Sequence, residues 1–262
     1  MADNFEIIAG DPSSHVIIHV PHSARYIPEE VRRDILLDDS DLEIELNEVT
    51  DSLTAEIVLH ATANLVSPPT LFMNKFSRLV IDPERFPDER EIMNQIGMGA
   101  VYSKTSTGEQ LRKPNFDSSR LIANYYVPYA KALTDLVSDK LKIHDKVLII
   151  DFHSYRNEQH PNAVNHGQAR PPVCIGTDPF HTPSGLVELA QSQFASFGES
   201  VLNQPYAGTY VPLDFYQSDP RVASIMLENR ADLLVDERLN PGPNFDEYSK
   251  ALAQFIMLAA NY

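Results

Sequence analysis

The sequence predicts an α/β fold in which one mixed, twisted β-sheet lies between helices on both faces. Short runs rich in valine and isoleucine alternate along the chain with longer segments whose apolar residues recur at helical spacing. The short runs do not alternate strictly between apolar and polar residues, which is typical of strands covered on both faces. With 262 residues, no internal repeat and no long linker, we expect a single domain over 1–262.

The expected strands are residues 15–20, 78–82, 146–151, 172–176 and 223–228. Each is short, rich in branched aliphatic residues and bounded by turn residues or charges. The expected helices are residues 41–61, 118–142, 183–197 and 244–260. The third begins after Thr182, and Pro183 suits the first turn of a helix.

Composition excludes several classes of partner. The chain carries 21 Lys and Arg against 37 Asp and Glu, a net charge of −16, which argues against nucleic acid and against an anionic membrane surface. Cys174 is the only cysteine, so we expect no disulfide, no cysteine metal site and a reducing compartment. The first residues do not form a signal-peptide pattern, and no apolar run is long enough for a membrane helix. We therefore expect a cytoplasmic protein.

The ends of four expected strands carry reactive side chains. Two strings, VIIHVPHS and VLIIDFHS, share one shape: an aliphatic run, two further residues and then His-Ser. The residues at the four ends are His22-Ser23, His153-Ser154, Asp82 with Arg85, and Glu228 with Arg230. Because ligands bind beyond the carboxyl ends of strands in open α/β sheets, we expect these side chains to meet at one sheet edge.

Two imidazoles and a carboxylate are the ligands of a hydrolytic zinc ion that keeps a position open for water. A further carboxylate is then needed as a general base, and arginines recognise substrate carboxylates. The pattern favours hydrolysis of an amide in a small acidic molecule. Iron, manganese, cobalt and nickel also suit this ligand set. A histidine after a strand is more often structural, and only the two matching contexts favour a metal site.

Five strings in order resemble the N-formylglutamate amidohydrolase family: VPHS (20–23), TD (50–51), SRLVIDPER (77–85), DFHS (151–154) and MLENR (226–230). A later Gly-Tyr feature of the family is matched loosely by Gly208-Thr209-Tyr210. The family looks like a relative of the zinc carboxypeptidases. The resemblance therefore implies a phosphorylase/hydrolase-like, zinc carboxypeptidase-like sheet.

The resemblance also implies a role for each matching residue. His22 and His153 would bind one zinc ion or another divalent metal, with Asp51 as the third ligand and Glu228 as the general base. The implied substrate-binding residues are Arg78, Asp82, Arg85, Arg230, Ser154 and Tyr210. The implied reaction converts N-formyl-L-glutamate and water into formate and L-glutamate, a step in histidine breakdown. The expected partner is thus a small anionic amino-acid derivative.

The sequence departs from the family pattern at two positions. Glu84 stands where the family's D-x-N-R motif has asparagine, which puts the substrate clamp in question, and Ala24 replaces a glycine. The position of Asp51 raises a separate question, because it lies opposite the apolar stripe of the expected helix 41–61. Either that helix breaks near Thr50, or its polar face meets the site. Glu48 is the alternative third ligand.

Two other functions remain open. One is a zinc carboxypeptidase, or a deacylase of another N-acyl amino acid or peptide. The other is a non-catalytic binding domain that has lost its metal. Because the chain is acidic overall, attraction of an anionic substrate must be local, and we expect Arg78, Arg85 and Arg230 to form a positive island.

Overall fold

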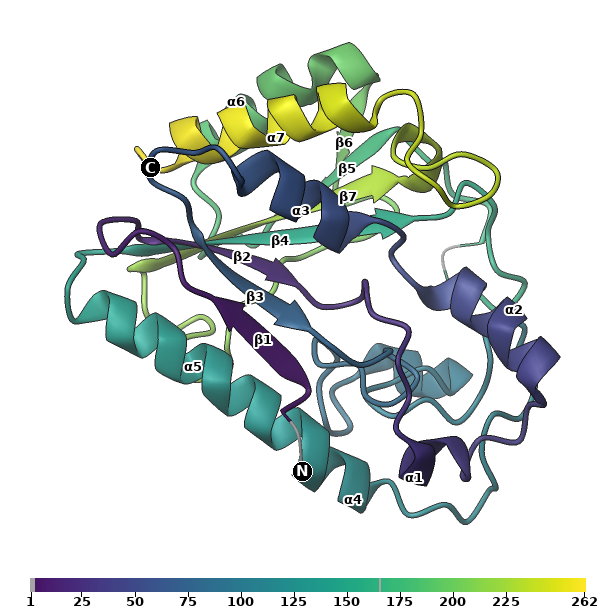
Figure 1. Ribbon diagram of the computed structural model, residues 1–262. Helices are drawn as coiled ribbons and strands as arrows, with labels where there is room; N and C mark the ends of the chain where they lie inside the picture. Colours follow the sequence, from purple (N-terminus) through teal and green to yellow (C-terminus); the bar gives the residue numbers. More distant parts are fainter. Residues whose placement is uncertain (1–2, 165) are drawn as a thin grey trace.

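The computed structural model describes residues 3–164 and 166–262, which form one seven-stranded sheet in the order β1-β3-β2-β4-β7-β5-β6 (Figure 1). The strands are β1 (Phe5–Ile8), β2 (Val16–Val20), β3 (Thr70–Asn74), β4 (Val147–Tyr155), β5 (Val173–Gly176), β6 (Ser200–Leu202) and β7 (Val222–Arg230). Neighbours among β3, β2, β4 and β7 are parallel, whereas β1 and β5 are antiparallel to β3 and β7. The predicted mixed α/β sheet is confirmed.

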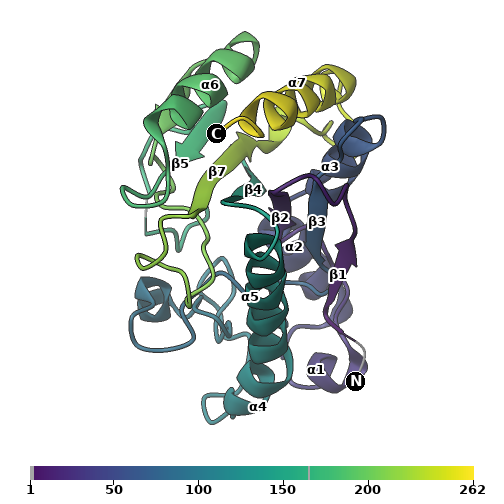
Figure 2. The same cartoon turned by 90° about the vertical axis from the view of Figure 1, so that its left-hand side faces the viewer.

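Helices cover both faces of this sheet. The helices of the chain are α1 (Glu29–Arg32), α2 (Asp39–Val49), α3 (Thr54–Thr62), α4 (Ser119–Leu121), α5 (Val127–Leu141), α6 (Ser184–Phe194) and α7 (Phe245–Ala259). In Figures 1 and 2, α5 lies on one face, and α3, α6 and α7 lie on the other. A π-helical turn over Ile122–Tyr126 joins α4 to α5. The helices expected over 118–142, 183–197 and 244–260 are therefore confirmed.

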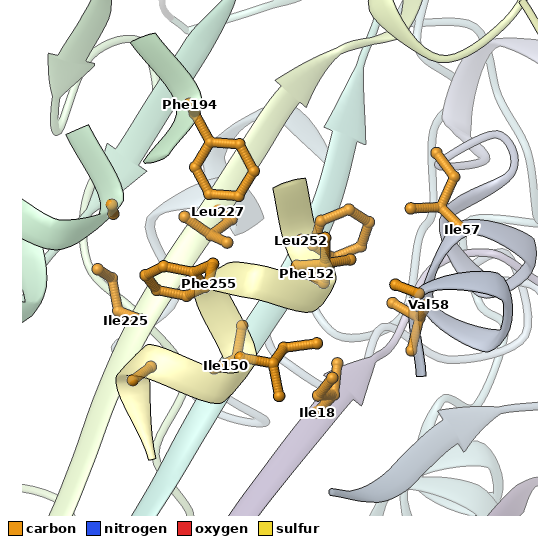
Figure 3. Packing of buried hydrophobic residues seen from close by; sticks show 14 of the residues in the cluster. Ile18, Ile57, Val58, Ile150, Phe152, Phe194, Ile225, Leu227, Leu252 and Phe255 are labelled. Carbon is orange, nitrogen blue, oxygen red and sulfur yellow. The ribbon is translucent and has the colours of Figure 1, made fainter. Parts of the chain in front are cut away.

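The central strands are apolar on both faces because both faces are covered. In β2, Ile18 packs in the cluster that contains α7, whereas Ile17 packs in the cluster that contains α5. In β4, all nine residues are buried. Figure 3 shows Ile150 and Phe152 of β4 close to Leu252 and Phe255 of α7. This packing holds the carboxyl ends of β2, β4 and β7 as a rigid edge.

The expected strand 78–82 is wrong. These residues form a turn, in which the Val80 N–H donates to the Ser77 carbonyl at 2.8 Å. Leu79 and Val80 are both fully buried, but they pack in different apolar clusters. An irregular segment enclosed on all sides thus has the same apolar composition as a buried strand. The strand that precedes this turn is β3.

The expected helix 41–61 is interrupted. It forms two helices, α2 and α3, with Thr50 in extended conformation and Leu53 at a φ of 59° between them. The Asp51 N–H donates to the His22 carbonyl at 3.0 Å, which ties the interruption to the segment that follows β2. Of the two arrangements considered for Asp51, the break near Thr50 is the one that occurs.

Candidate active site

Three side chains from distant parts of the chain converge at the carboxyl edge of the sheet. His22 follows β2, His153 lies near the end of β4, and Asp51 lies between α2 and α3. The Nδ1 atoms of the two histidines are 3.3 Å apart. Asp51 Oδ2 lies 2.9 Å from His153 Nδ1 and 3.7 Å from His22 Nδ1. All three residues are buried, and these atoms form a group that could hold a metal ion.

The spacing of these three atoms fits a small divalent cation. Ligands at about 2.0–2.1 Å from a tetrahedral zinc ion lie roughly 3.3 Å from one another. The three observed separations of 3.3, 2.9 and 3.7 Å scatter around that value. The two Nδ1 atoms and the Asp51 oxygen can all direct lone pairs at one cation that lies between them. The donor set therefore suits a metal ion.

The far nitrogens of both imidazoles face other carboxylates. His22 Nε2 donates to Asp82 Oδ1 at 2.9 Å, and His153 Nε2 lies 3.1 Å from Asp151 Oδ1. Glu84 Oε2 lies 3.6 Å and 3.4 Å from the same two nitrogens. Such carboxylates fix the orientation of metal-binding histidines and raise their basicity. They leave the two Nδ1 atoms free to face Asp51.

The charges around the two histidines favour added positive charge. Burial and Arg78 act to lower the pKa of His22, but the surrounding carboxylates outweigh them and raise it. Burial acts in the same direction on His153, and the nearby carboxylates hold its pKa well above the usual value. Burial acts to raise the pKa of Asp51, but its contacts with both imidazoles lower it. A divalent cation would supply the charge that this centre favours.

Glu228 differs from the other acids of the site. It is the register partner of His153 on the neighbouring strand β7. It is buried, and its Oε2 atom has no hydrogen-bond partner among the described residues. Burial raises the pKa of Glu228 to about 8. A buried carboxylate that can gain and lose a proton near neutral pH is suited to proton transfer.

A cavity of about 1230 Å³ opens onto this centre. Its wall includes His22, Asp51, His153 and Glu228. It also includes four of the predicted substrate-binding residues, which are Arg78, Arg85, Ser154 and Tyr210. The Ser154 N–H donates to Asp51 Oδ2 at 3.3 Å, and the Tyr210 N–H donates to Asp151 Oδ2 at 3.2 Å.

Two predicted substrate-binding residues lie away from the wall, as far as the described residues define it. Asp82 is fully buried behind His22, where it also accepts a hydrogen bond of 2.7 Å from Arg78 Nη2. Arg230 pairs with Asp232 at 2.7 Å. Arg85 lies 3.6 Å from Asp82. The expected positive island is therefore not formed, because each of its three arginines lies beside a carboxylate.

Glu48 lies apart from the group formed by His22, Asp51 and His153. Its carboxylate lies 3.4 Å from Arg156 Nε and 3.3 Å from His160 Nδ1, on the cavity wall. Of the two acids considered as third ligand, it is Asp51 whose oxygen lies among the imidazole nitrogens.

The residues that the sequence reasoning missed are Asp151 and His19, and Glu84 was noted only as a departure. His19 Nδ1 lies 2.9 Å from Asp151 Oδ1, and His19 Nε2 lies 2.7 Å from the Tyr129 hydroxyl. Asp151 could have been found from strand periodicity, since residues 151 and 153 of one strand point to the same face. An aspartate inside an otherwise aliphatic run was the signal.

The helices formed by residues 3–164 and 166–262 include none with the length and apolar character needed to cross a membrane.

Comparison with known proteins gives a family match. A family model for N-formylglutamate amidohydrolase matches residues 14–235. The fold is similar to a crystal structure of N-formylglutamate amidohydrolase from Ralstonia eutropha JMP134, with a TM-score of 0.79 and 20% identity over 100% of this chain and 98% of that one. It is also similar to the gene product Atu2144 from Agrobacterium tumefaciens, with a TM-score of 0.71 and 17% identity over 99% and 96% of the two chains. No curated protein matches the sequence.

Proposed function

Because the chain belongs to the N-formylglutamate amidohydrolase family, we propose that it hydrolyses N-formyl-L-glutamate to formate and L-glutamate with the help of one divalent cation. The observation that carries this proposal is the convergence of His22, Asp51 and His153, which line one cavity together with Glu228. Zinc is the cation we propose first, because two nitrogens and one carboxylate oxygen are a common zinc ligand set.

The bound cation would polarise the formyl carbonyl and make a water molecule more acidic. The remaining work falls to side chains of this chain. Asp82 and Asp151 hold the two imidazoles in orientation from behind. Glu228 takes the proton of the attacking water and delivers it to the amine nitrogen as the C–N bond breaks. The net reaction adds one water and releases formate and L-glutamate.

The proposed substrate is a small anionic amino-acid derivative. Ser154, Tyr210, Arg78 and Arg85 remain proposed contacts because all four line the cavity. Arg85 donates no hydrogen bond within the described part of the chain, and 30% of its side chain is exposed. Its N–H groups therefore remain available to donate to a substrate carboxylate, although Asp82 lies 3.6 Å away. We also propose that the reaction belongs to histidine breakdown, as the family resemblance implies, and that it takes place in the cytoplasm, as the single cysteine and the lack of a signal-peptide pattern suggest.

The direct test is an activity panel on purified protein loaded with zinc. We expect formate release from N-formyl-L-glutamate, with weaker or no cleavage of N-acetyl-L-glutamate and of dipeptides. Cleavage of a dipeptide without formate release from N-formylglutamate would contradict the proposal.

The first variant to test is Glu228→Gln. It keeps the shape of the side chain but cannot accept the proton of water. We expect kcat to fall by about 10²–10⁴-fold, with the zinc content by elemental analysis unchanged. Loss of zinc together with activity would instead make Glu228 a metal ligand.

The size of the cavity favours one second candidate. Its volume of about 1230 Å³ exceeds the roughly 300–1,000 Å³ of ordinary small-molecule sites. A deacylase acting on a larger N-acyl amino acid or peptide would use this extra room. The same panel, extended to longer acyl groups, separates the two, since a rise in kcat/KM with acyl length would favour the second candidate.

A further inference from the structure

The arginines on the cavity wall differ in how their charge is balanced. The wall contains Arg78, Arg85, Arg90, Arg156 and Arg170. The first four lie near carboxylates. Arg78 and Arg85 lie 2.7 Å and 3.6 Å from Asp82. Arg90 lies 2.6 Å from Asp88, and Arg156 lies 3.4 Å from Glu48. Arg170 has no carboxylate within 4.0 Å among residues 3–164 and 166–262. Its positive charge is therefore the one on this wall that no described acid neutralises.

Two tyrosines hold the Arg170 side chain in place. Its guanidinium carbon lies 5.4 Å from the centre of the Tyr155 ring and 5.6 Å from the centre of the Tyr206 ring. Its Nη1 atom donates to the Tyr206 hydroxyl at 2.8 Å. Aromatic faces attract a cation without cancelling its charge. The side chain is thus oriented while its charge remains available.

The opposite edge of the guanidinium is unused. Arg170 Nε is buried and has no hydrogen-bond partner within the described ranges. The only hydrogen bond recorded there from its guanidinium leaves through Nη1. Nε and Nη2 together form the fork that binds both oxygens of a carboxylate. A buried donor without a partner is rare in folded proteins and is commonly satisfied by a ligand or water.

Arg170 also lies on the side of the cavity that carries the general base. Tyr206 is linked to β5 through its carbonyl, which accepts a hydrogen bond of 3.2 Å from Cys174 Sγ. Cys174 is the register partner of Glu228. Burial raises the pKa of Tyr206, and the charge of Glu228 adds to this effect. A substrate whose amide reaches Glu228 therefore extends along a wall on which Arg170 is present.

We propose that Arg170 is a specificity-determining residue that binds a carboxylate of the substrate through its guanidinium. The assignment rests on the proposed function for the identity of the substrate, but the unpaired charge itself does not depend on the reaction. It differs from the sequence-based expectation, which gave this role to Arg78, Arg85 and Arg230.

The test compares Arg170→Gln with wild type on three substrates: N-formyl-L-glutamate, N-formyl-L-glutamine and N-formyl-L-isoglutamine. We expect KM for N-formylglutamate to rise by about 10- to 100-fold, with kcat changed by less than about threefold and zinc content unchanged. One of the two monoamides lacks the carboxylate that Arg170 binds, so its KM should be insensitive to the substitution. Equal losses on all three substrates, or no loss on any, would overturn the assignment.

Two further variants distinguish binding from a structural role. Arg170→Lys keeps the charge but loses the fork, so it should recover part of the lost affinity. Arg156→Gln removes an arginine of the same wall whose charge Glu48 already balances, and its KM should stay within about twofold of wild type. A fall in thermal stability of Arg170→Gln without a change in KM would point to a structural role and contradict the proposal.

Direct binding separates this proposal from the proposed function. Calorimetry with L-glutamate needs no turnover, and we expect Arg170→Gln to bind L-glutamate at least about tenfold more weakly than wild type. If wild type releases no formate but binds L-glutamate in an Arg170-dependent way, the proposed reaction fails and the role of Arg170 stands. If both proteins bind L-glutamate equally, the role of Arg170 fails whatever the reaction.

Discussion

At the scale of single residues, the acids around the two histidines divide into different tasks. Asp51 shares its oxygen with the Nδ1 atoms, Asp82 and Asp151 face the Nε2 atoms, and Glu228 has no donor for its Oε2 atom within the described chain. Under the proposed function, the same functional group would therefore orient an imidazole, bind the cation or transfer a proton according to its neighbours.

The orienting role of Asp82 gives a prediction about cation affinity. Asp82→Asn keeps the size of the side chain but weakens the charge that holds His22 Nε2. We expect the affinity for zinc to fall by about 10- to 100-fold, as measured by competition with a chelator. Glu48→Gln is the matched control, because Glu48 lies outside the donor group, and its affinity should stay within about twofold. An unchanged affinity in Asp82→Asn would contradict the orienting role.

Glu45 of α2 gives a prediction about pH. Its carboxylate is buried and accepts hydrogen bonds from the Ser106 N–H at 2.7 Å and the Ser106 hydroxyl at 2.8 Å. Burial outweighs these bonds and raises the pKa of Glu45 above its ordinary value of 4.5. Above pH 4.5 the folded state therefore still holds a proton on Glu45 that the unfolded state has released. The protonated Glu45 side chain stabilises the folded state at low pH, and this stabilisation is lost as pH rises from 4.5 through the pKa of Glu45 in the folded state.

Glu45→Gln should remove this part of the pH dependence. We expect the free energy of unfolding from urea titrations to fall less between pH 4.5 and pH 7 than it does in wild type. Glu56→Gln changes an exposed acid on α3 and should leave the wild-type slope unchanged. If the free energy of unfolding changes with pH equally in wild type and Glu45→Gln, then Glu45 has the same pKa in the folded and unfolded states, and the prediction fails.

At the scale of elements, the site depends on a long segment without regular strands between β3 and α4. Arg112 lies inside this segment, fully buried, and donates to the carbonyls of Leu79 and Tyr102. Burial lowers the pKa of Arg112 to about 10. The Tyr102 hydroxyl in turn donates to Asp82 Oδ2 at 3.1 Å. One guanidinium thus connects the turn at Leu79 to the residue that supports His22.

Replacement of Arg112 tests this connection. Arg112→Leu leaves two buried carbonyl groups without donors, so we expect the protein to lose about 2–4 kcal/mol of stability in urea titrations. Arg33→Ala is the control, because Arg33 is exposed and its pair with Glu29 is screened by water. That change should leave the free energy of unfolding unchanged within the error of the titration. An equally small effect in both variants would mean that water replaces the guanidinium.

At the scale of the whole molecule, the chain carries a net charge of −16, and acidic side chains are also in excess within the site. Five carboxylates, those of Asp51, Asp82, Glu84, Asp151 and Glu228, surround two imidazoles at the edge of the sheet. Such crowding costs free energy unless positive charge offsets it. The folded state should therefore gain stability from a divalent cation.

Metal removal tests this expectation on the intact protein. With free zinc at about 100 times its Kd, binding adds roughly 2.7 kcal/mol, which should raise Tm by about 5–10 °C over protein treated with EDTA. A variant with His22→Ala and His153→Ala should show no such rise. An equal rise in that variant would place the cation elsewhere, and no rise in wild type would contradict the metal centre.

Some of this protein could be predicted from sequence because the signals are local. Runs such as VLIIDFHS indicate a buried strand and also show which side chains lie at its end. The strands β2, β4, β5 and β7 were therefore predicted together with His22, His153 and Glu228. Three further strands, β1, β3 and β6, were not found. β1 and β6 contain no buried residue, and β3 (TLFMN) contains no valine or isoleucine, so none of them matches the pattern of a buried run of branched aliphatic residues.

The sequence by itself determined the alternation of strands and helices, the reactive residues at strand ends and the family they indicate. Only the tertiary structure decided that Asp51 lies beside the imidazoles while Glu48 does not, that residues 78–82 form a turn, and that Arg170 alone among the described arginines of the wall has no acid near it. The physical reason is that propensity and periodicity depend on neighbours along the chain. The pairing of charges depends on neighbours in space, and the packed sheet sets those neighbours.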